Sequence, residues 1–144
     1  MSAPPNSTLP AKPGLDSELL LANGFTVEGR WIVGGFGSLQ LDPSPSRGPG
    51  VYAFAVNGAV KYVGVATVCM VQRLNFYGRP GKSQSTNIRI KQLLLTELSS
   101  QAELDILVAR PEKGLWRSLP VDMCAGLEVG LVKAFFLPWN IKGI

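Results

Sequence analysis

The stretch GVYAFAVNGAVKYVGVATVCMVQR, residues 50–73, decides the fold. Two apolar runs, 50–56 and 59–65, flank the dipeptide Asn57-Gly58. Asn-Gly readily adopts the positive φ that a type I′ turn requires at both of its central positions. The stretch therefore predicts a tight antiparallel β-hairpin.

Each run carries a tyrosine beside a glycine, in the order Gly50-Val51-Tyr52 and then Tyr62-Val63-Gly64. A glycine weakens the interior of a strand by roughly 0.5–1 kcal/mol, but it lets another group approach the backbone closely. A phosphate chain is one candidate for that group. Arg73 follows Gly64 by nine residues and could bind the phosphate.

This pair of motifs resembles the paired signature of the GIY-YIG nucleases. Further features of that family follow in the same order along the chain, at Arg73, Tyr77, Glu128 and Asn140. The resemblance covers about residues 48–144. It implies a DNA endonuclease that uses Mg²⁺, for which Mn²⁺ can substitute. Tyr77 is similar to the tyrosine of the excision-repair branch, where many other members place a histidine.

Length and composition indicate one folded domain. The chain has 144 residues, of which 46% are hydrophobic, and this is enough for a core of its own. It contains no apolar run of about 20 residues and no signal-peptide pattern, so we expect a cytoplasmic protein with no membrane partner. The absence of histidine excludes Ser-His and Cys-His catalysis and histidine metal sites. The cysteines Cys69 and Cys124 are too far apart in sequence for a metal knuckle and are expected to be small buried residues.

The charge is unevenly distributed. No acidic residue occurs between Asp42 and Glu97. That interval holds the basic residues Arg47, Lys61, Arg73, Arg79, Lys82, Arg89 and Lys91. It could be an ordinary solvated face, but it coincides with the hairpin and the loop after it, which favours a phosphate-binding surface. The residues that we expect to contact DNA are Lys61, Arg79, Lys82, Asn87, Arg89 and Lys91.

The order of the expected elements predicts an α+β fold, a small antiparallel sheet flanked by helices. Before the hairpin we expect a disordered tail over 1–14, and a helix and strand extension over 15–47 that packs on the core domain, 48–144. After it we expect helices over 68–76 and from Ser85 or Thr86 to about Ser100, and a strand containing Leu104, Ile106 and Val108. A loop over 111–119 and a helix from Pro120 to about Leu137 complete the chain.

Glu128 is the most informative single residue. In the last helix it shares a face with Cys124, Leu131 and Phe135, where a carboxylate is costly unless a cation or strong donors compensate. A salt bridge to a core arginine is one explanation. The other is a Mg²⁺ site of one carboxylate and several waters, and the resemblance assigns metal binding to this position.

The two hairpin tyrosines could be plain β-formers. The resemblance instead implies that Tyr52, or both Tyr52 and Tyr62, act on the nucleophilic water, and that Arg73 binds the scissile phosphate. A phenol can take a proton if positive charge lowers its pKa from about 10, and Arg73 and Lys61 could supply that charge. Our preferred assignment makes Tyr52 the base and Tyr62 a phosphate-positioning residue.

Asn140 is implied to support the site by hydrogen bonds. Val65 departs from the excision-repair branch, which often has lysine there, so the site could be weaker. The sequence thus predicts a Mg²⁺-dependent DNA endonuclease in repair or restriction. The alternatives are a nucleic-acid-binding module without catalysis, and a nuclease subunit that needs a protein partner or a homodimer.

Overall fold

The computed structural model describes residues 11–140 and confirms the predicted α+β class. The helices are α1 (Ser17–Ala22), the short 3-10 helix η2 (Gly35–Gly37), α2 (Met70–Gly78), α3 (Ser85–Ser99) and α4 (Met123–Ala134). The strands are β1 (Thr26–Val33), β2 (Leu39–Leu41), β3 (Gly50–Val56), β4 (Ala59–Ala66), β5 (Leu104–Ala109), β6 (Gly114–Trp116) and β7 (Leu119–Val121). Within the described residues, no helix combines the length and the hydrophobicity needed to cross a membrane.

Five strands form one antiparallel sheet in the order β2-β1-β5-β3-β4. β3 lies between β5 and β4, and all 7 of its residues are buried. At the β3–β4 turn, φ is 49° at Asn57 and 88° at Gly58, which confirms the predicted hairpin. β1 pairs with β5 and β2 with β1, so the segment before residue 47 supplies two strands of the same sheet.

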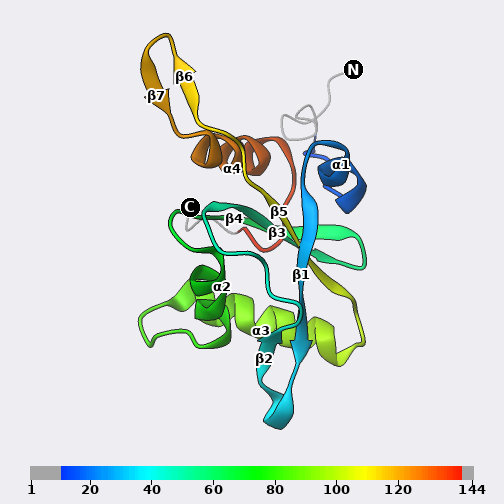
Figure 1. Cartoon of the computed structure of the whole chain (residues 1–144). Helices are drawn as coiled ribbons and strands as arrows, with labels where there is room; N and C mark the ends of the chain where they lie inside the picture. Colours follow the sequence, from blue (N-terminus) through cyan, green and yellow to red (C-terminus); the bar gives the residue numbers. More distant parts are fainter. Residues whose placement is uncertain (1–10, 141–144) are drawn as a thin grey trace, which may run out of the picture.

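Helices cover both faces of this sheet (Figure 1). Successive side chains of a strand point to opposite faces, and β3 shows this alternation clearly. Tyr52 and Phe54 pack with residues of α2 and α3, whereas Val51 and Ala53 pack with residues of α1 and α4. The two tyrosines of the hairpin motifs therefore belong to the face that α2 and α3 cover.

The largest difference from the predicted elements lies before the last helix. The segment 111–119, predicted to be a loop, contains most of a second hairpin, β6–β7, with Arg117 in its turn at a φ of 58°. Pro120, predicted to begin the helix, pairs within this hairpin instead. α4 begins after Asp122, whose carboxylate accepts a hydrogen bond from the amide of Ala125 at 3.0 Å. The Asp122 side chain accepts a hydrogen bond from an N–H group of the first turn, whereas the side chain of Pro120 has no acceptor. Asp122 therefore determines where α4 begins.

The other boundaries differ from the prediction by only a few residues. α2 begins at Met70 and extends to Gly78, and α4 ends at Ala134 because Phe135 has extended backbone angles. Of the tail predicted over 1–14, residues 1–10 lie outside the described residues. The carbonyl of Pro13 accepts a hydrogen bond from the amide of Phe136 at 2.8 Å.

Candidate active site

Three tyrosines meet on the face of the sheet that α2 and α3 cover. The hydroxyls of Tyr52 and Tyr77 are 2.6 Å apart, and the Tyr77 hydroxyl donates a longer hydrogen bond of 3.4 Å to Tyr62. Tyr52 and Tyr77 are fully buried, while Tyr62 retains 8% exposure. Three of the residues that the sequence predicts to be catalytic thus share one hydrogen-bonded cluster, with Tyr62 the nearest to solvent.

Arg73 joins this cluster from the same helix as Tyr77. The two residues are four apart on α2, which places their side chains one above the other. Nη2 of Arg73 donates a hydrogen bond to the Tyr77 hydroxyl at 3.1 Å, and the guanidinium carbon lies 4.9 Å from the centre of the tyrosine ring. The side chain is half-buried, so the guanidinium is held at the surface of the tyrosine cluster.

Asn87, predicted to contact DNA, belongs to the support of this arginine. It is 7% exposed, and its Oδ1 accepts a hydrogen bond from Nη1 of Arg73 at 3.5 Å. Its Nδ2 donates to Oε1 of Gln84 at 3.0 Å, and the same oxygen accepts from the amide of Gly81 at 2.8 Å. The sequence predicts a helix start at a capping Ser85 or Thr86, which is wrong: Gln84 is at the N-cap position of α3, and no side chain caps this helix. The signal in the sequence was a glutamine directly before α3. Its side-chain oxygen can reach the backbone amide of Gly81 before it and the side-chain amide of Asn87 after it.

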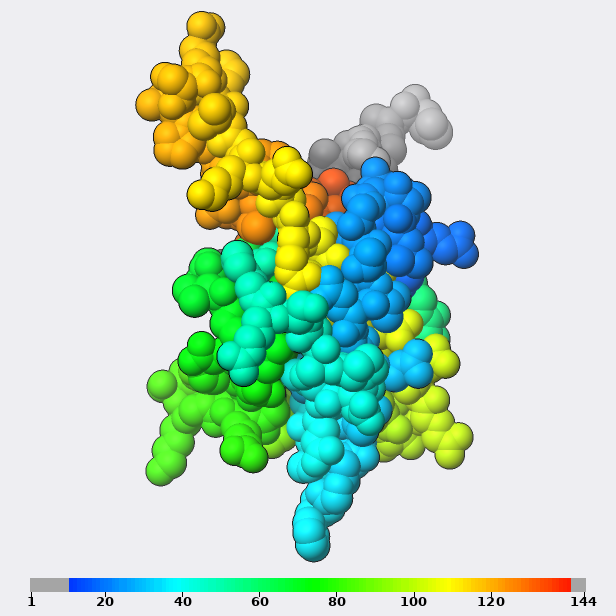
Figure 2. All heavy atoms as spheres, viewed as in Figure 1, coloured from blue at the N-terminus to red at the C-terminus, as the bar shows by residue number. Residues whose placement is uncertain are grey.

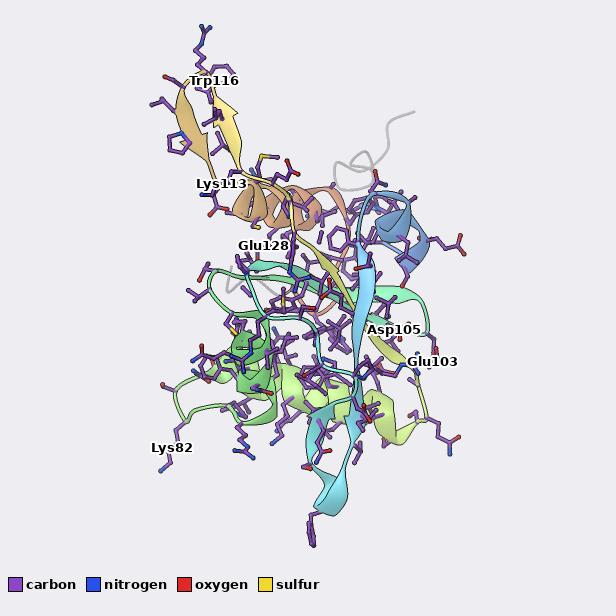
Figure 3. All side chains as sticks on the ribbon, viewed as in Figure 1. Lys82, Glu103, Asp105, Lys113, Trp116 and Glu128 are labelled. Carbon is purple, nitrogen blue, oxygen red and sulfur yellow. The ribbon has the colours of Figure 1, made fainter. Side chains whose placement is uncertain are left out.

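Glu128 lies on the inner side of α4. Its helical neighbours Cys124, Leu131 and Phe135 pack against the core beneath α4, and Figure 3 shows Glu128 on the side of the helix next to the sheet. The carboxylate is half-buried, and no ion pair within residues 11–140 includes it. The core salt bridge considered from the sequence is therefore absent from the described residues. The negative charge of Glu128 is close enough to raise the pKa of Tyr52, which links α4 to the tyrosine cluster.

Burial controls the acidity of the tyrosines. It raises the pKa of Tyr52 well above 10, and the neighbouring Tyr62 raises it further, whereas Arg73 only partly opposes this rise. Burial likewise raises the pKa of Tyr77, and Tyr52 and Tyr62 add to the effect. Arg73 thus lowers the pKa of Tyr52 as expected, but the net shift is upward, so the pKa does not fall below its usual value of about 10. Desolvation of the phenolate outweighs the attraction of one half-buried guanidinium.

The room left by Gly64 is occupied by a side chain of the protein. Tyr52 lies opposite Gly64 in the β3–β4 pair, and a Cβ built on Gly64 would lie 2.5 Å from both Cζ and Oη of Tyr52. At Gly50 the corresponding Cβ would lie 2.8 Å from the carbonyl oxygen of Ala109. The expectation that a phosphate approaches these glycines is therefore wrong. The space at Gly64 is filled by the ring of Tyr52, and the space at Gly50 by the backbone of the neighbouring strand.

Asn140 and Arg89 attach the last described residues, 139 and 140, to the rest of the fold. Asn140 lies opposite the backbone of Val63, where its Oδ1 accepts from the Val63 amide and its Nδ2 donates to the Val63 carbonyl, both at 2.8 Å. Nη2 of Arg89, a predicted DNA contact, donates to the carbonyl of Trp139 at 2.9 Å. Asn140 thereby holds the strand that carries Tyr62.

The remaining predicted DNA contacts differ in exposure. Arg79 and Lys82 are exposed in the loop between α2 and α3, and Figure 3 shows Lys82 extending away from the body. Lys61 on β4 and Lys91 on α3 are half-buried. None of these four forms an ion pair within the described part of the chain, so their charges are free to meet phosphates.

The surface beside Arg73 is hollowed. A cavity of about 130 Å³ lies over the start of α2, lined by Thr67, Val68, Cys69, Gln72, Arg73 and Phe76. A second, of about 250 Å³, shares Thr67 and extends past Val65 to the start of α4. Arg73 lines the first of these hollows. Within them, Val65 offers no charge at the position where the excision-repair branch often has lysine.

The side chains of the described residues could hold Mg²⁺ only at a site that has few protein ligands. Residues 11–140 contain no group of three or more His, Cys, Asp or Glu side chains that could enclose a metal ion. Mg²⁺ commonly keeps several waters and takes one or two carboxylates together with substrate oxygens. Glu128, a half-buried carboxylate without an ion pair in the described residues, satisfies that requirement.

Comparisons with known proteins relate this fold to nucleases. No protein-family model matches the sequence, and no curated protein matches it. The structure is similar to EndoII of bacteriophage T4, solved as a mutant, with a TM-score of 0.67 and 19% identity over 86% of this chain and 97% of that chain. It is also similar to the restriction endonuclease HPY188I in complex with product DNA, with a TM-score of 0.51 and 12% identity over 92% of this chain and 88% of that one. At these identities the similarity concerns the fold.

Proposed function

We propose that this chain is a metal-dependent DNA endonuclease of the GIY-YIG type. The observation that carries the proposal is the hydrogen-bonded cluster of Tyr52, Tyr77 and Arg73, with Tyr62 at its surface. The charge of Glu128 acts on the same cluster from a different helix. The order of motifs in the sequence and a fold shared with two nucleases support the same conclusion.

Arg73 binds the phosphate in this proposal. A guanidinium stays charged at any working pH and presents a planar pair of donors that match two phosphate oxygens. Hydrogen bonds to Tyr77 and Asn87 fix one side of the group, so little side-chain entropy is lost on binding. The half-buried position strengthens the attraction relative to an exposed arginine.

The tyrosines act as oriented hydroxyls. The raised pKa of Tyr52 leaves even less phenolate to act as a base than an ordinary tyrosine would, but the protonated hydroxyl can still orient a water molecule. Tyr62 is the most exposed of the three, at 8%, which supports a role for it in contacting the substrate phosphate. We therefore propose that Tyr52 orders the nucleophilic water and that Tyr62 positions the phosphate.

Glu128 would hold the metal ion. A bound Mg²⁺ would supply positive charge to the phosphoryl oxygens and lower the pKa of a coordinated water. Among the residues of the chain itself, the packing of α4 on β3 and β4 supports this proposal, because it holds Glu128 at the sheet that carries Tyr52 and Tyr62. Mn²⁺ should substitute because it also prefers oxygen ligands.

A binding module without catalysis is the second candidate. The specific observation in its favour is Val65, which lines the hollow next to the site at the position where the excision-repair branch often has lysine. Such a module would bind DNA through Arg79 and Lys82 in the exposed loop and would release intact DNA.

Nicking of supercoiled plasmid separates the two candidates. We expect nicked or linear product with Mg²⁺ and none with EDTA, while fluorescence anisotropy shows DNA binding in both buffers. Arg73→Ala should abolish cleavage, whereas Arg30→Ala, on an exposed arginine paired with Asp105, should retain it. Intact plasmid in Mg²⁺ with normal binding would establish the binding module instead.

A further inference from the structure

The outer face of α4 is largely uncovered among the described residues, although Nζ of Lys12 donates a hydrogen bond to the carbonyl of Val132 near its C-terminal end at 3.2 Å. No residue of this helix is fully buried, and its outward side chains include Val129 at 47% and Met123 at 43% exposure. A Cβ built on Gly126 or Gly130 would meet nothing within 4 Å, so another backbone could approach this face closely. A helix with apolar residues all round is normally covered on every side.

The β6–β7 hairpin extends this apolar surface. It rises from the N-terminal end of α4 on the side away from the five-stranded sheet and stands clear of the body (Figures 1 and 2). Leu115, Trp116 and Leu119 are 70%, 64% and 62% exposed on it, and Figure 3 shows Trp116 near its tip. An isolated two-stranded hairpin is marginally stable in water. A large exposed apolar patch of this kind marks an interaction surface.

We propose that this surface, the outer face of α4 together with the β6–β7 hairpin, binds a second copy of this chain with the two α4 helices antiparallel. The argument is the distribution of charge along the face. At 100° per residue, Asp122 and Lys133 fall on the same side of the helix as Gly126 and Gly130, and both are exposed. They are 11 residues apart, which is about 16 Å along the axis.

A two-fold axis near residue 128 makes this pattern self-complementary. Antiparallel pairing about that point places Lys133 of each copy beside Asp122 of the other, and Gly126 opposite Gly130. The same residue pairs occur twice, as a two-fold interface requires. A parallel pairing would instead place Asp122 beside Asp122 and Lys133 beside Lys133, which is unfavourable.

The hairpin contributes to the same interface. It projects beyond the start of α4, so in the antiparallel pair it would reach the end of the other copy's α4. Phe136 follows that end and is 59% exposed. Apolar side chains of the hairpin can therefore cover Phe136 of the second copy and extend the buried surface beyond the helix pair.

The chemistry of the face disfavours DNA as its occupant. The outer face of α4 carries one charge of each sign, Asp122 and Lys133, and the hairpin adds only Arg117 at its turn, whereas a DNA surface is rich in Lys and Arg. Glu128 lies on the opposite side of α4, so pairing leaves the candidate active site accessible. The dimer requires neither DNA nor metal, and failure of this inference would leave the proposed nuclease function intact.

Sedimentation equilibrium of the full chain, from about 1 to about 200 µM without DNA, tests the pairing. We expect a monomer–dimer equilibrium. Gly130→Leu should raise the dimer dissociation constant about tenfold or more, because the larger side chain blocks close approach while better helix propensity keeps the monomer folded. Leu21→Glu on α1, where Leu21 is 46% exposed, is the control and should leave the dissociation constant unchanged. Circular dichroism confirms folding of each variant.

Charge reversal tests the orientation. Lys133→Glu and Asp122→Lys should each weaken self-association, since each brings two like-charged pairs together. An equimolar mixture of the two variants should recover a dimer, because every pair is again of opposite charge in the mixed species. Recovery of the dimer in the mixture supports the antiparallel arrangement.

Three results would overturn the proposal. The first is a monomer throughout the concentration range, and the second is a dimer unchanged by Gly130→Leu. The third is a mixture that stays monomeric although each variant is folded. If the full chain is monomeric and deletion of residues 1–10 produces the dimer, those residues occupy the surface and the second copy does not.

Discussion

Substitution of Gly64 by alanine tests the origin of the paired glycine and tyrosine motifs. The new Cβ would lie 2.5 Å from Cζ and Oη of Tyr52 and 3.0 Å from its Cε1. Real Cβ contacts this short do not occur, so the Tyr52 ring or the β4 backbone must move. We expect Gly64→Ala to destabilise the fold and disrupt the tyrosine cluster together.

The packing around Tyr52 sets the size of the effect. Its ring is fully buried, and the ring centres of Phe54, Tyr77 and Tyr62 lie 5.3, 6.2 and 6.4 Å away. Since no side is open, the ring cannot swing away without displacing a second aromatic group. Overpacking a well-filled core costs about 1–3 kcal/mol, and a shift of the Tyr52 hydroxyl would also lengthen its 2.6 Å contact with Tyr77.

Urea unfolding followed by circular dichroism measures this cost. Gly35→Ala is the matched control, because a Cβ there meets nothing within 4 Å and the residue has no positive φ. The penalty of Gly64→Ala should shrink in a Tyr52→Ala background, where the clash is absent. A Gly64→Ala variant as stable as wild type would refute the packing argument and restore the view that Gly64 is kept open for a ligand.

Three further predictions follow from the same contacts. If four to six basic residues touch phosphates, log K for duplex DNA should fall against log salt with a slope of roughly −4 to −5; an anisotropy titration with a slope near zero would show an ordinary solvated surface. Asn140→Ala removes both hydrogen bonds to Val63 and should lower the free energy of unfolding by about 1–3 kcal/mol. The control, Asn75→Ala on an exposed residue of α2, should have little effect, and equal urea midpoints for the two variants would contradict the role of Asn140. The pKa values of Tyr52 and Tyr77 are raised in the folded state, so above about pH 10 these tyrosines ionise in the unfolded chain but not in the folded one. Their contribution to the free energy of unfolding is therefore complete below about pH 10 and is lost as the pH rises above it. Urea unfolding between about pH 8 and 11 should show this decline and a smaller one in Tyr52→Phe; no decline would contradict the burial argument.

Local patterns predicted much of the fold. The Asn57-Gly58 turn specified the central hairpin because its φ requirement is a property of two adjacent residues. The family resemblance placed both Arg73 and Tyr77 among the site residues, and the structure joins them by a hydrogen bond. Local rules for helix starts were less reliable: no Ser or Thr side chain caps α3, where Gln84 is at the N-cap position, and Pro120 lies in a strand rather than at the start of α4.

Features that depend on distant residues could not be predicted in the same way. The raised pKa of Tyr52 arises from burial among aromatic groups of three elements, which no local motif encodes. The role of Asn87 depends on Arg73 and Gln84 meeting it across the loop between α2 and α3. The β6–β7 hairpin was missed because its residues are exposed on both strands, so they lack the alternation that marks a half-buried strand.

The central claim is that Glu128 supplies the metal-dependent step of DNA cleavage. The measurement that tests it most directly is the single-turnover cleavage rate of a DNA substrate, identified by the plasmid assay, with saturating Mg²⁺. Glu128→Gln keeps the shape of the side chain and removes its charge, so we expect the rate to fall by about 10²–10³ with little change in DNA affinity. Glu18→Gln, on an exposed carboxylate of α1, should cleave at the wild-type rate. Cleavage by Glu128→Gln at the wild-type rate and with the same Mg²⁺ dependence would contradict the account.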